Sequence, residues 1–240
     1  MRDGYQGFYE FLKELKTTEE ATDSFVKLLN DGRELRGIVS SVETIHFISN
    51  FVKRDQTQTN LILDPACGSG CLLAYIGMIT ESSKTIGFDI NRTIIEKAST
   101  LFPELDLEIK STTKDFLLDE KVDLIVSELP WRARLRNRIF KGEKHRITMI
   151  GDAIIFYSTQ HLSDDGTAIF LVGPSFLNRS DSLSLIARLE DDGVYLNAVI
   201  GVERPRPDTK SNGSLLIFSK RENENIFFSG CTLLEGEDTS

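Results

Sequence analysis

Residues 61–70 read Leu-Ile-Leu-Asp-Pro-Ala-Cys-Gly-Ser-Gly and join a short apolar run to a turn that contains two glycines. This pattern predicts a β-strand followed by a turn, with a helix that begins directly after the turn. Glycine lets the backbone approach a ligand closely, and Asp64 at the carboxyl end of the strand can meet a positively charged group. The stretch therefore predicts a ligand site at the end of a strand in an α/β fold.

Short β-branched or aliphatic runs alternate with helical patterns along most of the chain. Strands are predicted at 61–64, 85–89, 105–110, 122–127 and 167–172, and helices at about 41–53, 70–80, 91–101, 151–162 and 180–191. Such alternation predicts a parallel sheet with helices on both faces. The last two predicted strands, 195–202 and 214–219, are joined by a polar loop with prolines and are expected to pair antiparallel.

The length and composition fit one domain. A chain of 240 residues with 40% hydrophobic side chains can bury the core of one α/β domain with a small appendage. We expect a helical N-terminal lead-in at 1–35, the main domain at 36–230 and an acidic tail at 231–240. No apolar run approaches the roughly 20 residues of a membrane span, and the N-terminus lacks the apolar stretch of a signal peptide. The sequence thus predicts a cytoplasmic protein without a membrane partner.

Cysteine usage and net charge narrow the classes of ligand. Cys67, Cys71 and Cys231 form no CxxC pair, and few histidines accompany them, so no metal site is expected. The formal net charge of −9 is unusual for a protein whose whole surface binds nucleic acid. Any contact with nucleic acid therefore requires a local basic patch.

A basic loop between 132 and 146 supplies such a patch. Its cations are Arg132, Arg134, Arg136, Arg138, Lys141, Lys144 and Arg146. Alternate arginines beside a pocket can neutralise phosphates, and Arg132, Arg134, Arg136 and Arg138 are the predicted nucleic-acid contacts. A solvated charge run, or a contact with an acidic partner, is the alternative. A later loop with Arg204, Arg206 and Lys210 would extend the same surface.

The string from Asp64 to Gly70 closely resembles the S-adenosylmethionine loop of the N6-adenine DNA methyltransferases. The resemblance implies a Rossmann-like class I S-adenosylmethionine-dependent methyltransferase fold, an α/β fold with a mixed seven-stranded sheet that has an antiparallel edge strand. It also implies S-adenosylmethionine as the cofactor. The residues of this loop that it assigns to cofactor binding are Asp64, Pro65, Ala66, Gly68 and Gly70.

Two further motifs resemble cofactor contacts of the same family. In Ile-Gly-Phe-Asp-Ile-Asn, residues 86–91, the acid stands at the end of the second strand, where it can accept both ribose hydroxyl protons. The resemblance implies Asp89 as the ribose ligand with Ile90 beside it, whereas capping of the next helix is the alternative for Asp89. Asp115 and Phe116 stand where the family contacts the cofactor's adenine, with a turn or cap role as the alternative for Asp115.

Upstream of the first strand, residues 37–45 resemble the family's loop over the methionine end of the cofactor. Ser41 stands where the family has the threonine of a Thr-Pro pair, and Val42 replaces the proline. The resemblance implies that Ser41 contacts the cofactor. A helix N-cap role explains Ser40 or Ser41 equally well.

The stretch 122–131, Val-Asp-Leu-Ile-Val-Ser-Glu-Leu-Pro-Trp, is an apolar strand followed by a polar residue, a proline and an aromatic ring. It resembles the catalytic motif of the family. The lone pair of adenine's exocyclic nitrogen is delocalised into the ring, so acceptors must draw its hydrogens away while an aromatic ring stacks the flipped base. The resemblance assigns Glu128 and the Leu129 carbonyl as acceptors, with Pro130 matching the family and Trp131 as the stacking ring.

Two positions of this motif depart from the family. Glu128 is one methylene longer than the usual Asp, Asn or Ser, and Leu129 replaces the usual proline. Both departures favour a variant with impaired turnover. Ser127 becomes the acceptor only if the register slips by one residue.

Residues 152–176 resemble the helix, glycine turn, strand and proline that follow the catalytic motif in modification subunits of type I restriction systems. The resemblance covers about 35–220 and implies transfer of methyl to adenine N6 in DNA. Because no segment corresponds to a target-recognition domain, DNA and a specificity or target-recognition subunit are the expected partners. The alternatives are a module that binds cofactor without turnover, or a methyltransferase that acts on RNA or on a protein glutamine.

Overall fold

The computed structural model describes residues 40–52, 59–136, 147–203, 205, 211–223 and 225–232. The expected helical lead-in at 1–35, Arg138 with the rest of the basic loop beyond 136, and residues 233–240 of the expected tail lie outside these ranges.

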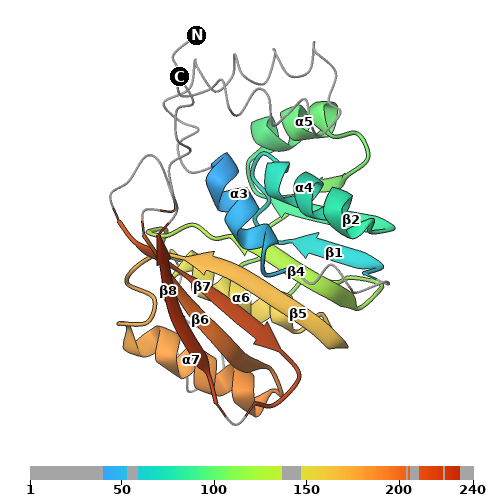
Figure 1. The fold of residues 1–240 in the computed structure, drawn as a ribbon. Coiled ribbons are helices and arrows are strands. Elements are labelled where there is room, and N and C mark those ends of the chain that lie inside the picture. Colours follow the sequence, from blue (N-terminus) through green and yellow to red (C-terminus); the bar gives the residue numbers. More distant parts are fainter. Residues whose placement is uncertain are drawn as a thin grey trace.

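The described chain forms one eight-stranded sheet in the order β3-β2-β1-β4-β5-β7-β6-β8. Its strands are β1 (Leu61–Asp64), β2 (Lys84–Asp89), β3 (Asp106–Ile109), β4 (Val122–Glu128), β5 (Leu162–Val172), β6 (Tyr195–Glu203), β7 (Gly213–Ser219) and β8 (Phe227–Thr232). The first five strands are parallel, and β7 runs antiparallel to both of its neighbours, β5 and β6. Figure 1 shows the resulting twisted sheet.

The predicted α/β class and the antiparallel pairing of the last two predicted strands are confirmed, but the strand count is eight instead of seven. The missed strand, β8, pairs parallel with β6 and forms the outer edge of the sheet, so the antiparallel β7 lies inside it. β8 gives a weak signal because its consecutive Phe227 and Phe228 are 62% and 68% exposed and show no alternation. The strand includes Cys231 and Thr232, which were expected in the tail.

Five helices cover the two faces of the sheet in the described part of the chain. They are α3 (Val42–Ser49), α4 (Cys71–Thr80), α5 (Arg92–Leu101), α6 (Ile150–Thr159) and α7 (Ser180–Asp191). Figure 1 shows α3 and α4 on one face of the sheet and α6 and α7 on the other. Ile62, Leu124 and Val126 belong to the core cluster with α3 and α4, whereas Leu63 and Ile125 belong to that with α6 and α7. Burial of both faces explains why the central strands are continuous apolar runs. No helix among the described residues is long and apolar enough to span a bilayer.

The order of strands locates the cleft. The chain moves from β1 outward through β2 to β3, and then returns to the other side of β1 with β4 and β5. Loops that leave neighbouring strands in opposite directions open a crevice at the carboxyl ends of those strands. A ligand site is therefore expected beyond the ends of β1, β2 and β4.

Gly87 allows close packing around the paired ends of β1 and β2. It pairs with Asp64 across β1 and β2, and a Cβ atom at Gly87 would lie 2.5 Å from Leu107 Cδ2 and 3.0 Å from both Cys67 Sγ and Leu73 Cδ2. Gly87→Ala should therefore lower the free energy of unfolding by about 1–3 kcal/mol, measured by urea denaturation. Gly230→Ala is the matched strand control, since a Cβ atom there meets nothing within 4 Å. Equal stability of the two variants would contradict this packing.

Candidate functional site

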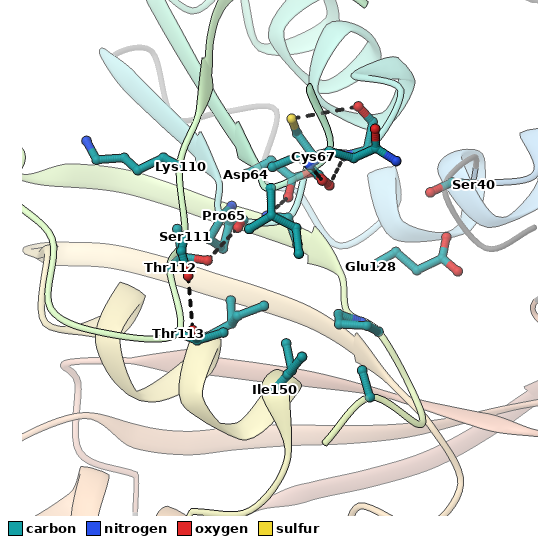
Figure 2. A pocket seen from close by; sticks show the side chains of 18 residues that line it. Ser40, Asp64, Pro65, Cys67, Lys110, Ser111, Thr112, Thr113, Glu128 and Ile150 are labelled. Atoms are coloured by element: carbon teal, nitrogen blue, oxygen red, sulfur yellow. Dashed lines mark hydrogen bonds between the residues drawn. The ribbon is translucent and has the colours of Figure 1, made fainter. Parts of the chain in front are cut away.

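A cleft of about 540 Å³ opens where the topology places it. Its walls come from the ends of β1, β2 and β4, the segment after β3, the residue before the N-cap of α3 and the first two turns of α6 (Figure 2). Predicted site residues in its lining are Asp64, Pro65, Ala66, Gly68, Asp89, Ile90, Glu128 and Pro130. The volume falls within the range usual for small-molecule and cofactor sites.

The glycine turn folds back on the end of β2. Gly68 and Gly70 have φ values of 51° and 77°, in the left-handed region that favours glycine. The Gly68 amide donates to Asp89 Oδ2 at 3.1 Å, and the Asn91 amide donates to Asp89 Oδ1 at 2.8 Å. Each oxygen of Asp89 keeps one further acceptor position. Gly70, the N-cap residue of α4, supports the turn and does not line the cleft.

Asn91, not Asp89, supplies the side-chain cap of α5. The Asn91 side chain accepts from the Ile94 amide at 3.2 Å, as an N-cap residue does. The carboxylate of Asp89 lies instead between the turn and the cleft. Capping of α5 therefore does not account for the acid at the end of β2.

Asp64 is the buried acid of the site, with 2% of its surface exposed. Burial raises the pKa of its carboxyl to about 7, and the charges of Asp89 and Glu128 act in the same direction. The Ser127 hydroxyl and the Ala66 amide, which donates to Oδ1 at 3.0 Å, oppose this rise in pKa. A cationic ligand beside Asp64 would favour its ionised form.

The wall beyond β3 differs from the prediction. Lys110, Ser111, Thr112 and Thr113 line the cleft, and Thr112 Oγ1 donates to the Pro65 carbonyl at 2.8 Å. This bond ties the segment after β3 to the turn after β1. No motif singles out these residues in the sequence, although three adjacent hydroxyl side chains after a strand are a usable signal.

Asp115 and Phe116, the predicted adenine contacts, are not among the lining residues. Asp115 is exposed. Phe116 is buried, with its ring 5.7 Å from that of Phe88 and 4.5 Å from that of His161 between ring centroids. The structure thus brings Phe116 into the core and leaves Asp115 at the surface.

The sequence left open whether Ser40 or Ser41 caps the helix and which of them faces the ligand site. Ser41 is the N-cap of α3, and its Oγ accepts from the Thr44 amide at 3.2 Å. Ser40, one residue earlier, lines the cleft. Of the two serines, Ser41 therefore caps the helix and Ser40 lines the cleft.

The end of β4 keeps the predicted register. Ser127 is fully buried and pairs with Phe170, whereas Glu128 and Pro130 line the cleft. Figure 2 shows Glu128 extending from the end of β4 with its carboxylate toward the segment of Ser40. Leu129 between them is buried in the core, and its amide donates to the Leu171 carbonyl at 3.0 Å. The slip that would make Ser127 the acceptor does not occur.

Trp131 lies against the sheet and is not part of the cleft lining. A Cβ atom at Gly173 would lie 2.9 Å from Trp131 Cγ, and one at Gly213 would lie 3.3 Å from its Cζ2. Two glycines thus leave room for the indole, and contact with Gly173 occupies part of its surface. Any stacking of a base by Trp131 requires the part of the ring that these glycines leave open.

An ion pair supports this side of the site. The Arg179 guanidinium donates to both oxygens of Asp152, at 2.8 and 2.7 Å. Asp152 follows Gly151, which packs on Leu129 in the first turn of α6, and Arg179 ends the turn that begins at Gly173. The pair therefore joins the two segments that contact the stretch from Leu129 to Trp131.

Residues 132–136, called here the arginine segment, lie between β4 and α6, with bends at Arg132 and Arg136. Arg134 forms an antiparallel bridge with Met149, and the Leu135 amide donates to the Thr148 carbonyl at 2.9 Å. Exposed and partly buried residues alternate along the segment: Arg132, Arg134 and Arg136 are exposed, whereas Leu135 is partly buried and packs against the core. The three arginines form an exposed row next to the cleft, which Ala133 of the same segment lines.

Within the described ranges, no three His, Cys, Asp or Glu side chains are grouped in a way that could hold a metal ion.

No protein-family model matches the chain. A protein named as methyltransferase 235L of Invertebrate iridescent virus 6 is 29% identical over 85 residues, which span 34% of this chain and 32% of the viral protein. Among solved structures, one from Listeria monocytogenes described as a class I S-adenosylmethionine-dependent methyltransferase aligns with a TM-score of 0.72 at 18% identity. That alignment covers 92% of this chain and 72% of the other.

Two solved structures carry the names of restriction-modification proteins. A modification subunit of a type I restriction enzyme from Vibrio vulnificus aligns with a TM-score of 0.68 at 16% identity, over 90% of this chain and 51% of the other. A type I restriction-modification methyltransferase subunit from Streptococcus thermophilus aligns with a TM-score of 0.62 at 18% identity. That alignment covers 78% of this chain and 45% of the subunit. The chain spans about half the length of these subunits. Together with the sheet order and the cleft, these similarities show that the chain has the class I S-adenosylmethionine-dependent methyltransferase fold, as the sequence predicted.

Proposed function

We propose that the cleft binds S-adenosylmethionine and that the protein is a methyltransferase. The observation that carries this proposal is the set of acids at the ends of β1, β2 and β4, which line one cleft beside a glycine turn in a class I methyltransferase fold. Asp89 keeps two acceptor positions for the ribose hydroxyls, and Ile90, which is 70% exposed, offers an apolar surface for adenine. These features fit the cofactor's sugar and base.

The acceptor that the site favours is the exocyclic nitrogen of adenine in DNA. Glu128 would accept one hydrogen of that nitrogen and the Leu129 carbonyl the other, and the arginine segment would hold neighbouring phosphates. The neighbours named as type I modification subunits support this acceptor, and they support a specificity subunit as a second partner.

When bound, S-adenosylmethionine supplies a methyl carbon that the acceptor nitrogen attacks in line, and the bond from this carbon to sulfur breaks with its electron pair left on sulfur. Glu128 and the Leu129 carbonyl would orient the nitrogen for this attack. The proton that the nitrogen loses after transfer would pass to water.

A module that binds cofactor without turnover is the second candidate. The length of Glu128 and the packing of Trp131 against Gly173 favour it, because both alter the acceptor side and leave the cofactor side unchanged. Methyl transfer from radiolabelled S-adenosylmethionine, tested with duplex DNA, RNA and protein, separates this candidate from the enzyme and identifies the acceptor class.

Asp89→Ala should weaken binding of S-adenosylmethionine about tenfold to a hundredfold, because it removes hydrogen bonds to a charged acceptor. The same change also removes the acceptor of the Gly68 amide and so alters the turn. The ribose contact is therefore tested by comparing ligands with and without a ribose hydroxyl. Calorimetry with adenosine and 3′-deoxyadenosine should show that the wild type prefers adenosine and that Asp89→Ala does not. Equal discrimination by both proteins would reject Asp89 as the ribose ligand.

Replacing Arg132, Arg134 and Arg136 together with glutamine should weaken binding to duplex DNA and flatten its dependence on salt. Each lost phosphate contact removes about 0.9 from the slope of log K against log salt, so the slope should change by up to about 3. The control replaces three exposed cations elsewhere, Lys84, Arg188 and Arg221, and makes the same change in net charge. If the arginine variant and the control variant bind duplex DNA with the same affinity and salt dependence, the arginine segment faces solvent or a protein partner instead of DNA.

Glu128→Asn should raise the rate of methyl transfer to adenine-containing DNA at saturating cofactor. The extra methylene of glutamate displaces the acceptor by about 1.5 Å, and a misplacement near 1 Å can cost about a hundredfold in rate. Leu129→Pro is added only in a second variant, because it removes the amide that bonds to Leu171. Glu120→Asn, at an exposed site outside the cleft, is the control. A wild-type rate above that of Glu128→Asn would identify Glu128 as a working residue.

A further inference from the structure

Three neighbouring strands of the sheet end in an acid that lines the same cleft. In the order β2-β1-β4 these acids are Asp89, Asp64 and Glu128, called here the acid row. Adjacent strands lie about 4.8 Å apart, so the row extends about 10 Å along the carboxyl edge of the sheet. Parallel pairing places the three strand ends at one edge, and the register puts Asp89 and Glu128 each two residues beyond the level of Asp64.

The two outer members of the acid row act on the middle one. Asp64 lies in the middle of the row, and the negative charges of its two neighbours add to the effect of burial in raising the pKa of its carboxyl. A positive charge on a ligand would relieve this repulsion, whereas a neutral ligand would not.

Lys110 is the basic residue among the described lining residues, and its ammonium is engaged elsewhere. It lies 4.3 Å from the centroid of the Phe88 ring and 3.5 Å from Glu108 Oε2. Figure 2 shows the Lys110 side chain extending away from Asp64 and Glu128.

We propose that the acid row makes the cleft select S-adenosylmethionine over its demethylated product by charge. This inference rests on the proposed function. The cofactor carries a positive sulfonium that becomes a neutral thioether when the methyl group leaves, whereas the rest of the molecule is unchanged. An acid row beside the cofactor therefore stabilises the complex before transfer more than the complex after it. Loss of this charge on transfer promotes exchange of the spent cofactor for a fresh one.

The test compares three ligands by calorimetry at pH 8, where Asp64 is largely ionised. The ligands are S-adenosylmethionine, S-adenosylhomocysteine and sinefungin, in which a protonated amine replaces the methylsulfonium. We expect the wild type to bind S-adenosylmethionine about tenfold to a hundredfold more tightly than S-adenosylhomocysteine, with sinefungin close to S-adenosylmethionine. Sinefungin separates the effect of charge from contacts with the methyl group.

Asp64→Asn and Glu128→Gln should each lower this ratio of affinities by at least about threefold. Asn at 64 retains an oxygen for the Ala66 amide, which limits damage to the turn. Glu96→Gln, at a position on α5 that is 62% exposed, makes the same change in net charge and should leave the ratio unaltered. Thermal melting of each variant checks that it is folded.

The outcomes separate this inference from the proposed function. Equal affinity of the wild type for all three ligands would overturn charge selection and leave cofactor binding intact. Selection that survives in both variants, or weak binding of sinefungin, would also overturn it. Failure of the folded wild type to bind any of the three ligands would overturn the proposed function and this inference together.

Discussion

The carboxylate of Asp89 accepts from two backbone amides at once, that of Gly68 in the turn after β1 and that of Asn91 before α5. These bonds hold the turn after β1 against the end of β2. The turn alone would have many conformations, because its two glycines have positive φ values that other residues rarely adopt. Parallel pairing of Asp64 with Gly87 brings the two strand ends together, and the cleft depends on this contact.

The features that depend on local pattern were predictable from the sequence. β1 and α7 have the predicted bounds, and the predicted acids at the ends of β1, β2 and β4 line one cleft. Each of these strands is short, apolar and followed by a polar residue, so its carboxyl end can be read from the sequence. Parallel strands present these ends at one edge, and the adjacency of β2, β1 and β4 in the sheet brings the three acids to one cleft.

Features that depend on distant residues were not predictable in this way. The orientation of Trp131 depends on Gly173 and Gly213, which follow it by many residues and carry no motif that links them to the indole. Burial of Phe116 depends on the ring of His161, at the end of α6. Ser40 and Ser41 were equivalent in sequence, and the cap of α3 decides between them. The edge strand β8 was missed because its consecutive phenylalanines are both exposed, so the strand lacks the alternation of apolar and polar residues that identifies a strand in sequence.

Charges of opposite sign lie next to each other at this site without cancelling. The acid row lines the cleft, whereas Arg132 and Arg134 are exposed on either side of Ala133, which lines the cleft. Antiparallel pairing with Met149 holds this alternation. A chain with a net charge of −9 can thereby keep exposed cations beside an acidic cleft, as the proposed binding of DNA and of a cationic cofactor would require. If the arginine segment were helical, its side chains would be spread around the axis, and separation of the two surfaces would be lost.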